Sequence, residues 1–425
     1  MKEELLHFIW NSGTLMKRNL QTHSGEPLHI VNSGTLNTDA GPDFFNAKIK
    51  IGTTLWAGNI EIHLKSSDWK NHKHHTDKKY NNVILHVVYH HDAEVCYENG
   101  KTIPVLELRN IIPPLMLRKY KQLQLNQNVI ACENLFIIPK EPLLTNWLNR
   151  LLVERLEDKC EHINELLIQN NNNWEETFYT ITARYFGMKI NAQPFEWLAQ
   201  NLPITVLSKH KNSLLQIEAL VFGVAGFLEE PHSENYIALM KREFDFMKSK
   251  YTLEPLDKSI WKFARTRPAN FPTSRLAQFA MLIYKSSHLF SRVLEAKDLP
   301  SIKNLYKIPV NEKLNSSLLH SQQSKIKNTE FGDTATELLL INSVIPVMFL
   351  YGKKVLLDDL CEKSLSLFEI LAPENNAVTR FWKKLNVPVN SSFDSQALLQ
   401  LKNNYCARLN CLNCIIGKEI LIKNE

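Results

Sequence analysis

The stretch 37–69, NTDAGPDFFNAKIKIGTTLWAGNIEIHLKSSDW, decides how the N-terminal part of this chain folds. Within it, residues 59–65 alternate between apolar and ionisable side chains, which is typical of a strand with one buried face. The ionisable face carries Glu61, His63 and Lys65. Burial of the apolar face accounts for the strand, but it gives no reason for three ionisable groups in a row. We therefore interpret this face as a candidate site.

A second strand is predicted just before this one, at about 44–51, and the two are expected to pair as a hairpin. That pairing would bring Asp43 close to Glu61. Two carboxylates beside a basic side chain can bind Mg²⁺ or Mn²⁺ and position a water molecule against a phosphodiester. Residues 83–89, VILHVVY, predict a further strand that is covered on both faces.

A Pro-Asp pair at 42–43, a hairpin and then Glu61-x-His63 resemble the signature of the PD-(D/E)xK nuclease superfamily. The resemblance implies that Asp43 and Glu61 bind the metal ion, and that His63 stands where the superfamily has the lysine that orients water. Lys65, on the same face, is a substitute for that lysine. The predicted order of helix, three strands, helix and strand also resembles this superfamily. It implies a restriction-endonuclease-like α/β domain with a mixed sheet flanked by helices.

Four sequence segments also resemble an uncharacterised bacterial family, the domain of unknown function 2851. They are AGPDF, GNIEIH, SSDW and YNNVILHVV. This resemblance extends over nearly the whole chain. The family has no established activity, so the resemblance informs the fold more than the function.

The composition is that of a soluble globular protein, because 44% of the 425 residues are hydrophobic and 22% are charged. The formal net charge of +6 is compatible with a nucleic-acid partner. The N-terminal residues have no apolar signal-peptide core. The apolar segment 338–350 is too short to span a bilayer, so we expect a buried helix there and no membrane partner. Seven cysteines without an export signal favour free thiols or metal ligands in a reducing cytoplasm.

The pattern of the chain changes after two consecutive prolines at 113–114. We predict an α/β domain over 1–112, a linker or arm over 113–141, and a mostly helical domain over 142–425. In the helical domain, apolar residues recur at three- and four-residue steps in several segments, including 174–185, 214–228, 234–251 and 275–289.

Ten of the fifteen histidines lie within the first 91 residues, so titratable chemistry is expected in the N-terminal domain. The densest group is His72, His74 and His75. It fits a second metal site, a loop in which His72 contacts nucleic-acid phosphate, or a solvated polar segment. A zinc hydrolase built on these three histidines is a further alternative, although their spacing lacks the H-x-x-x-H of such enzymes. His86, inside an apolar strand, is interpreted as a hydrogen-bonded core histidine.

A proline-rich loop, WKFARTRPANFPTSR at 261–275, concentrates basic residues in the helical part. Arginine side chains on a stiff loop suit bidentate contacts with phosphate oxygens. We expect nucleic-acid contacts from four residues there, namely Arg265, Arg267, Asn270 and Arg275. The alternative is that these arginines pair with acidic side chains and cap helix ends.

The C-terminal segment holds Cys406, Cys411 and Cys414 in a C-x₄-C-x₂-C pattern. Thiolates at this spacing can bind one Zn²⁺ or one iron–sulfur cluster, and either requires a fourth ligand. Some nucleases of the PD-(D/E)xK superfamily close such a C-terminal group with one earlier cysteine, and by that likeness Cys132 is the candidate. The alternative is that the thiols are buried and pack a terminal helix.

Together these observations favour a metal-dependent nuclease that hydrolyses phosphodiester bonds in DNA or RNA. In this interpretation Asp43 and Glu61 bind Mg²⁺ or Mn²⁺, and His63 or Lys65 orients or deprotonates water. The alternative is a catalytically inactive protein of the same fold that binds nucleic acid or acts as a scaffold.

Overall fold

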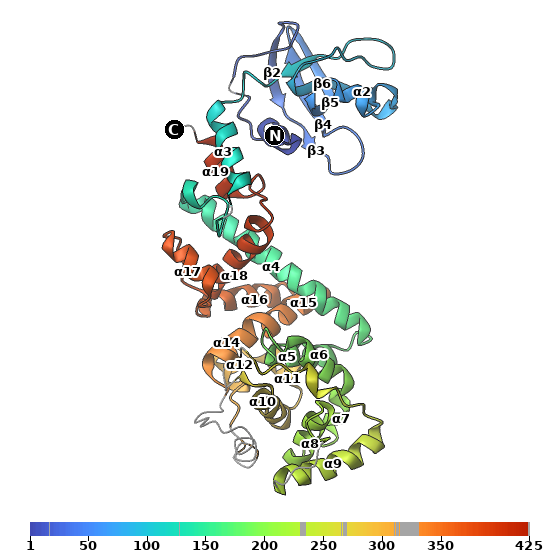
Figure 1. Ribbon diagram of the computed structural model, residues 1–425, viewed down its shortest axis with the longest axis vertical. Helices are drawn as coiled ribbons and strands as arrows, with labels where there is room; N and C mark the ends of the chain where they lie inside the picture. The colour runs from blue at the N-terminus through green and yellow to red at the C-terminus, as the bar shows by residue number, and fades with distance from the viewer. Residues whose placement is uncertain are drawn as a thin grey trace. The chain divides into compact units, whose positions relative to one another are not determined.

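The computed structural model describes residues 1–16, 18–126, 128–229, 235–264, 266, 270–309, 311, 314 and 331–423 (Figure 1). The chain forms two compact units. The first unit combines Met1–Trp147 with Leu401–Glu425, and the second is Leu148–Gln400. The C-terminal segment therefore belongs to the same unit as the N-terminal sheet.

The first unit is built on a seven-stranded mixed sheet. Its strands follow the order β1-β2-β4-β5-β6-β7, and β3 also pairs with β4. The strands from β1 to β5 pair antiparallel, whereas β6 is parallel to both β5 and β7. Their bounds are β1 (Leu20–Gln21), β2 (Pro27–Asn32), β3 (Thr35–Leu36), β4 (Phe44–Ile51), β5 (Thr54–Lys65), β6 (Val83–His90) and β7 (Val105–Glu107).

Helix α1 (Glu3–Asn11) packs against β5. Its sequence places apolar residues at helical spacing, and Leu5, Leu6 and Trp10 are completely buried. The Trp10 indole N–H donates a hydrogen bond of 2.9 Å to the Ser33 carbonyl, which satisfies its polar atom inside the core.

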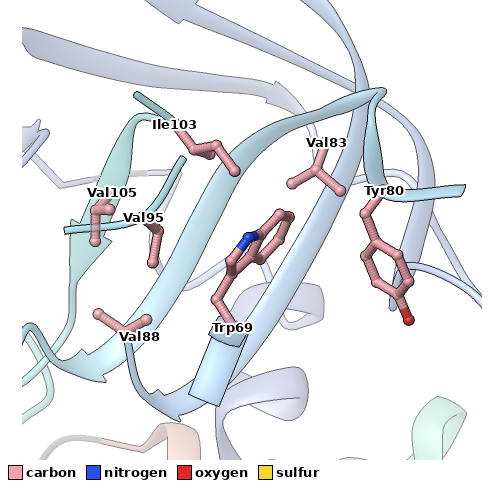
Figure 2. Close-up of a cluster of buried hydrophobic side chains, with 7 residues drawn as sticks. All are labelled: Trp69, Tyr80, Val83, Val88, Val95, Ile103 and Val105. Atoms are coloured by element: carbon pink, nitrogen blue, oxygen red, sulfur yellow. The ribbon is translucent and has the colours of Figure 1, made fainter. Parts of the chain in front are cut away.

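A short helix, α2 (Asp68–Asn71), directs Trp69 into a second group of buried side chains (Figure 2). This group covers one face of the sheet beside β6 and consists of Trp69, Tyr80, Val83, Val88, Val95, Ile103 and Val105. The Trp69 indole N–H donates to the Cys96 carbonyl at 3.2 Å. The tryptophan therefore fixes the polar segment 66–80 to the sheet.

Strands β4 and β5 do not pair in one uninterrupted register. Phe44 lies opposite Ile60, whereas Ala47 lies opposite Gly58, so β4 contains one extra residue between these pairs. Asn46, at this point, has a φ of 58°, in the left-handed region that asparagine tolerates better than most residues. This is a β-bulge, a feature that re-aims the side chains next to it.

The remainder of the first unit is helical. It contains α3 (Pro114–Leu125), a 3₁₀ turn (Glu133–Leu135), a π-helical turn (Leu401–Cys406) and α19 (Ile415–Ile422). Helix α19 packs against α3, and the Lys119 ammonium donates to the carbonyls of Ile420 and Lys423 at 3.1 and 2.8 Å. The segment predicted as a linker or arm thus includes a helix that packs against the C-terminal segment.

The second unit is helical throughout its described residues, and aromatic side chains fill much of its core. Phe279 contacts the rings of Tyr179, Phe186 and Phe195. Helix α4 (Glu141–Gln169) begins in the first unit and continues into the second. The other helices are α5 (Trp174–Phe186), α6 (Ala192–Asn201), α7 (Ile204–Ser208), α8 (Leu214–Val224), α9 (Asn235–Tyr251), α10 (Pro272–Lys285), α11 (Leu289–Glu295), α12 (Leu299–Leu305), α14 (Asp333–Leu339), α15 (Ile345–Val355), α16 (Asp358–Ile370), α17 (Ala377–Lys384) and α18 (Ser392–Gln400).

The apolar segment 338–350 lies in a continuous helical stretch, Asp333–Val355, with a π-helical turn at Leu340–Val344. By length and composition this stretch passes the test for a membrane-spanning helix. However, 72% of the most apolar 18-residue segment of this stretch is buried inside the protein, as in the core helix of a globular domain. The prediction of a buried helix is confirmed.

The broad architecture agrees with the sequence prediction, which gave an N-terminal mixed sheet with flanking helices followed by a helical region. The strand predicted at 44–51 is β4, and the one predicted at 83–89 is extended by a single residue in β6. The polar segment 66–80 forms one short helix and two 3₁₀ turns.

Candidate metal centre

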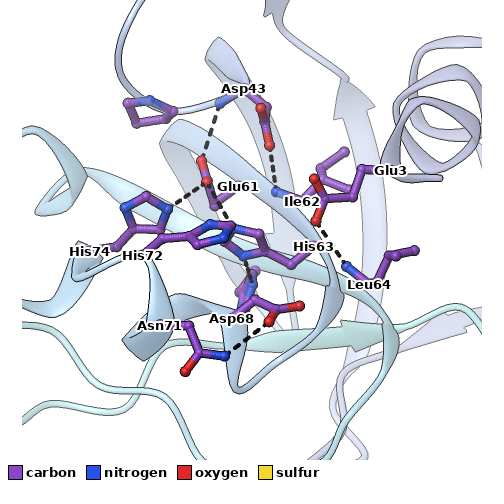
Figure 3. A network of polar contacts seen from close by, with 12 residues as sticks. Glu3, Asp43, Glu61, Ile62, His63, Leu64, Asp68, Asn71, His72 and His74 are labelled. Carbon is purple, nitrogen blue, oxygen red and sulfur yellow. Dashed lines mark hydrogen bonds and ion pairs between the residues drawn. The ribbon is translucent and has the colours of Figure 1, made fainter.

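The candidate site begins where the β4–β5 hairpin brings two carboxylates together (Figure 3). Asp43 immediately precedes β4, and the bulge in β4 sets it opposite Glu61 of β5. The Asp43 backbone N–H donates to Glu61 Oε2 at 3.2 Å, and the Ile62 backbone N–H donates to Asp43 Oδ2 at 2.8 Å. The two acids are therefore held by reciprocal bonds to each other's strand.

His63 lies two residues after Glu61 on the same face of β5, and it is 2% exposed. Its Nδ1 lies 2.8 Å from Nε2 of His86, which projects from the neighbouring strand β6. Its Nε2 lies 3.4 Å from Glu61 Oε1. A hydrogen bond from one ring nitrogen to a neighbour fixes the tautomer and the direction of the other nitrogen. His86 therefore orients His63 towards the carboxylates.

Two further histidines come from the segment after β5. His72 Nδ1 lies 3.1 Å from His63 Nε2, and His74 Nε2 lies 3.1 Å from Glu61 Oε1. The His74 ring stacks on Tyr80, with centroids 3.7 Å apart. Lys73, between the two histidines, has a φ of 62°, and this left-handed residue turns the chain so that both imidazoles face the sheet.

The donor atoms of this cluster suit a metal ion. One ligand atom from each of His63, His72 and His74 lies within 4.8 Å of the other two. Glu61 adds a carboxylate oxygen at 3.1–3.4 Å from two of these rings. Imidazole and carboxylate ligands together are typical of sites for first-row transition metals.

Without a bound cation, burial and the neighbouring Asp43 carboxylate make the charged form of Glu61 unfavourable. Burial, reinforced by the neighbouring Asp43 carboxylate, raises the pKa of Glu61 to about 9. Among the described residues, the basic side chains paired with these two acids are histidines, including His7, whose Nε2 lies 3.4 Å from Asp43 Oδ2. Burial lowers the pKa of His63 to about 4, with further lowering from His74. At neutral pH His63 is therefore an uncharged imidazole whose ring nitrogen can ligate a metal ion.

Comparison with known protein families assigns the chain to one family. Residues 3–377 match the model of a family described as protein of unknown function (DUF2851). The chain belongs to this family. No curated protein and no solved structure matches the chain. The part of the chain shared with DUF2851 includes the candidate metal centre and ends before the three C-terminal cysteines.

The structure brings together some of the site residues expected from the sequence. Asp43, Glu61, His63 and His72 are gathered at one place, whereas Lys65 is exposed at the end of β5. His86, interpreted as a core histidine, is hydrogen-bonded and completely buried, but its partner is His63.

The predicted nucleic-acid contacts in the second unit have different outcomes. Arg265 and Arg267 lie outside the described residues. Arg275 is only 5% exposed, donates to Gln278 at 2.9 Å and to Asn270 at 2.5 Å, and lies over the Phe331 ring. Its side-chain partners among the described residues are therefore amides and an aromatic ring rather than the acidic side chains that the alternative interpretation named. Burial lowers the pKa of Arg275 to about 10.

Sequence reasoning missed two residues of the site. His74 was considered only within a histidine-rich segment, because nothing in its spacing connects it to Glu61. His7 was assigned no role, and only the packing of α1 against β5 brings it to Asp43. The one available signal was the concentration of histidines in the first 91 residues.

Proposed function

We propose that the protein is a metal-dependent nuclease that hydrolyses phosphodiester bonds in DNA or RNA. The observation that carries the proposal is the convergence of Asp43, Glu61 and three histidines on one face of the hairpin. An acidic pair with one buried member, Glu61, and without Lys or Arg partners among the described residues gains from a bound divalent cation. The mixed sheet and the acidic hairpin are in keeping with the PD-(D/E)xK resemblance.

The donor set fits a metal ion, and it narrows the choice of metal. Asp43 and Glu61 supply carboxylate oxygens that suit Mg²⁺ or Mn²⁺, whereas His63, His72 and His74 supply nitrogens that Mg²⁺ rarely accepts. Mn²⁺ is therefore the better fit of the two. A bound divalent ion would polarise a phosphoryl oxygen and lower the pKa of a water molecule.

The protein's own groups have distinct roles in this proposal. Neutral His63, oriented by His86, offers a ring nitrogen that orients a water molecule where it does not ligate the metal. Lys65, at the end of β5, and His72 are exposed, and we assign them phosphate contacts. The carboxylates hold their geometry through backbone N–H donors, so they need little reorganisation when the cation binds.

A groove of about 690 Å³ in the first unit borders this site. His7, which contacts Asp43, is one of its lining residues, and Lys2, Arg408 and Lys418 line it as well. Two glutamates also line the groove and reduce its positive potential. We propose this groove as the path of the nucleic-acid backbone, and we expect its affinity to fall with added salt.

The test is cleavage of a panel of labelled single- and double-stranded DNA and RNA, with Mg²⁺, Mn²⁺ or no metal. Wild type is compared with Glu61→Gln and Asp43→Asn, which keep the side-chain shape but remove a charge. Glu26→Gln serves as the matched control, because Glu26 is exposed in the turn before β2.

Cleavage that requires metal, disappears in both site variants and persists in the control would support the nuclease. Equal cleavage by all four proteins would mean contamination and would refute the assignment. Binding of nucleic acid by all four proteins, without cleavage by any, would favour the scaffold function instead.

A further inference from the structure

Four cysteines from two distant parts of the chain line one small cavity in the first unit. Cys132 precedes a 3₁₀ turn, Cys406 ends the π-helical turn, and Cys411 and Cys414 lie just before α19. All four line the same cavity, together with Ala131, Tyr405 and Gly417. Their convergence depends on the fold, because Cys132 is separated from the others by the whole second unit.

The cavity is an apolar, thiol-rich environment. Cys132, Cys411 and Cys414 are each 7% exposed, and all four cysteines are free thiols. Three of the four thiols are buried and Cys406 is half-buried, although an aliphatic side chain would fill the same space without a reactive sulfur. Thiols gathered in this way are the ligand set of zinc and iron–sulfur centres.

The local backbone is arranged around the sulfur atoms. Cys414 is the N-cap residue of α19, next to the backbone N–H groups of the first helical turn. N–H groups close to a sulfur stabilise a thiolate that ligates a metal. Gly417 is required here because a Cβ atom at its position would lie 2.1 Å from the Cys411 carbonyl oxygen. The close approach of these two backbone segments places Cys411 and Cys414 side by side.

The spacing of the sulfur atoms distinguishes between the two kinds of centre. In tetrahedral zinc sites, with Zn–S bonds of about 2.3 Å, the four sulfurs lie roughly 3.8 Å apart. Among the described residues, the group of ligand atoms that all lie within 4.8 Å of one another is the histidine cluster, so no three of these sulfurs are that close. This wider arrangement suits a cluster with several metal atoms.

We propose that Cys132, Cys406, Cys411 and Cys414 bind an iron–sulfur cluster of the [4Fe–4S] type. The cluster would link the C-terminal segment to the segment after α3, so it would cross-link two distant parts of the chain within the first unit. No residue of the acidic hairpin lines this cavity, and the proposal holds whether or not the protein is a nuclease.

The experiment is purification of the full chain without oxygen, followed by reconstitution with ferrous iron and sulfide. Iron, acid-labile sulfide and zinc are quantified per chain, and the absorbance near 400 nm is recorded. The variants are Cys132→Ser and Cys406→Ser. Cys160→Ser is the matched control, because Cys160 is also 7% exposed but lies in the second unit.

The expected result is about four iron and four sulfide per wild-type chain, with both reduced by more than half in each ligand variant and unchanged in the control. One equivalent of zinc without sulfide would overturn the cluster assignment. Absence of any metal, or a disulfide among these cysteines in the protein purified without oxygen, would also overturn it. Because the wild-type metal content decides the question by itself, poor folding of a variant does not prevent the test.

Discussion

Replacing Glu61 with glutamine should have opposite effects on the metal-free and metal-bound protein. Glu61 is 4% exposed and lies beside Asp43, and these surroundings raise the pKa of its carboxyl group to about 9. At neutral pH the metal-free protein must therefore take up a proton at this position when it folds. Glutamine has nearly the same shape and needs no proton, so Glu61→Gln should stabilise the metal-free protein.

The size of this effect follows from the pKa of the unfolded group. Neutralising a carboxyl of pKa 4.5 at pH 7 costs about 3 kcal/mol, because each pH unit above the pKa contributes about 1.4 kcal/mol. Hydrogen bonds that glutamine makes less well reduce the expected gain to about 2 kcal/mol. Since the folded pKa is raised, the contribution of Glu61 to stability is complete below pH 4.5 and is lost as the pH rises towards 9. The difference between the variant and wild type should thus be small at pH 5 and grow with pH.

Hydrogen exchange of peptides from β5 and β6 measures the stability of the first unit separately from that of the second. Wild type and Glu61→Gln are compared at pH 5 and pH 7, each in EDTA and in Mn²⁺ at about 100 times its dissociation constant, which should stabilise wild type by about 2.7 kcal/mol. The variant should gain little from Mn²⁺. A variant that is less stable than wild type at pH 7 in EDTA would refute the reasoning, and so would one that Mn²⁺ stabilises equally.

Three further substitutions test other parts of the structure. His86→Leu removes the hydrogen-bond partner of His63, and we expect the affinity for Mn²⁺, measured by calorimetry, to fall about 10- to 100-fold; unchanged affinity would show that His86 does not position its neighbour. Arg275→Met should lower the free energy of unfolding in urea by about 1–3 kcal/mol and leave nucleic-acid affinity unchanged. Unchanged stability with weaker nucleic-acid binding would instead show that Arg275 contacts phosphate. Gly58→Ala should destabilise the sheet, since a Cβ there would lie 2.5 Å from Ile84 Cγ2, and thermal unfolding at an unchanged temperature would contradict this.

The parts of the fold that the sequence predicts well are those with a local cause. The alternation over 59–65 indicates a strand, and the preceding alternation with Gly52 between them indicates a hairpin, so the juxtaposition of Asp43 and Glu61 follows from two neighbouring segments. The long helices of the second unit were likewise predicted from apolar periodicity alone.

The rest depends on contacts between distant segments. His74 reaches Glu61 through a left-handed turn and a tryptophan anchor, neither of which has a periodic pattern. The burial of Arg275 depends on Phe331, more than fifty residues later in the chain. Likewise, no local pattern reveals that the C-terminal segment packs with the first unit, since this association is long-range.

The bulge at Asn46 makes the candidate metal centre sensitive to insertions and deletions in a way that substitutions do not reveal. If β4 kept all its residues but continued the pairing of Ala47 with Gly58 without a bulge, Asp43 would lie opposite Ile62, whose side chain is on the other face of the sheet. A homologue could then retain every acidic and imidazole side chain of the site and still lack the acidic pair. When other sequences of the family are aligned, the length of the hairpin between Asp43 and Glu61 is therefore as informative about function as the identity of these two residues.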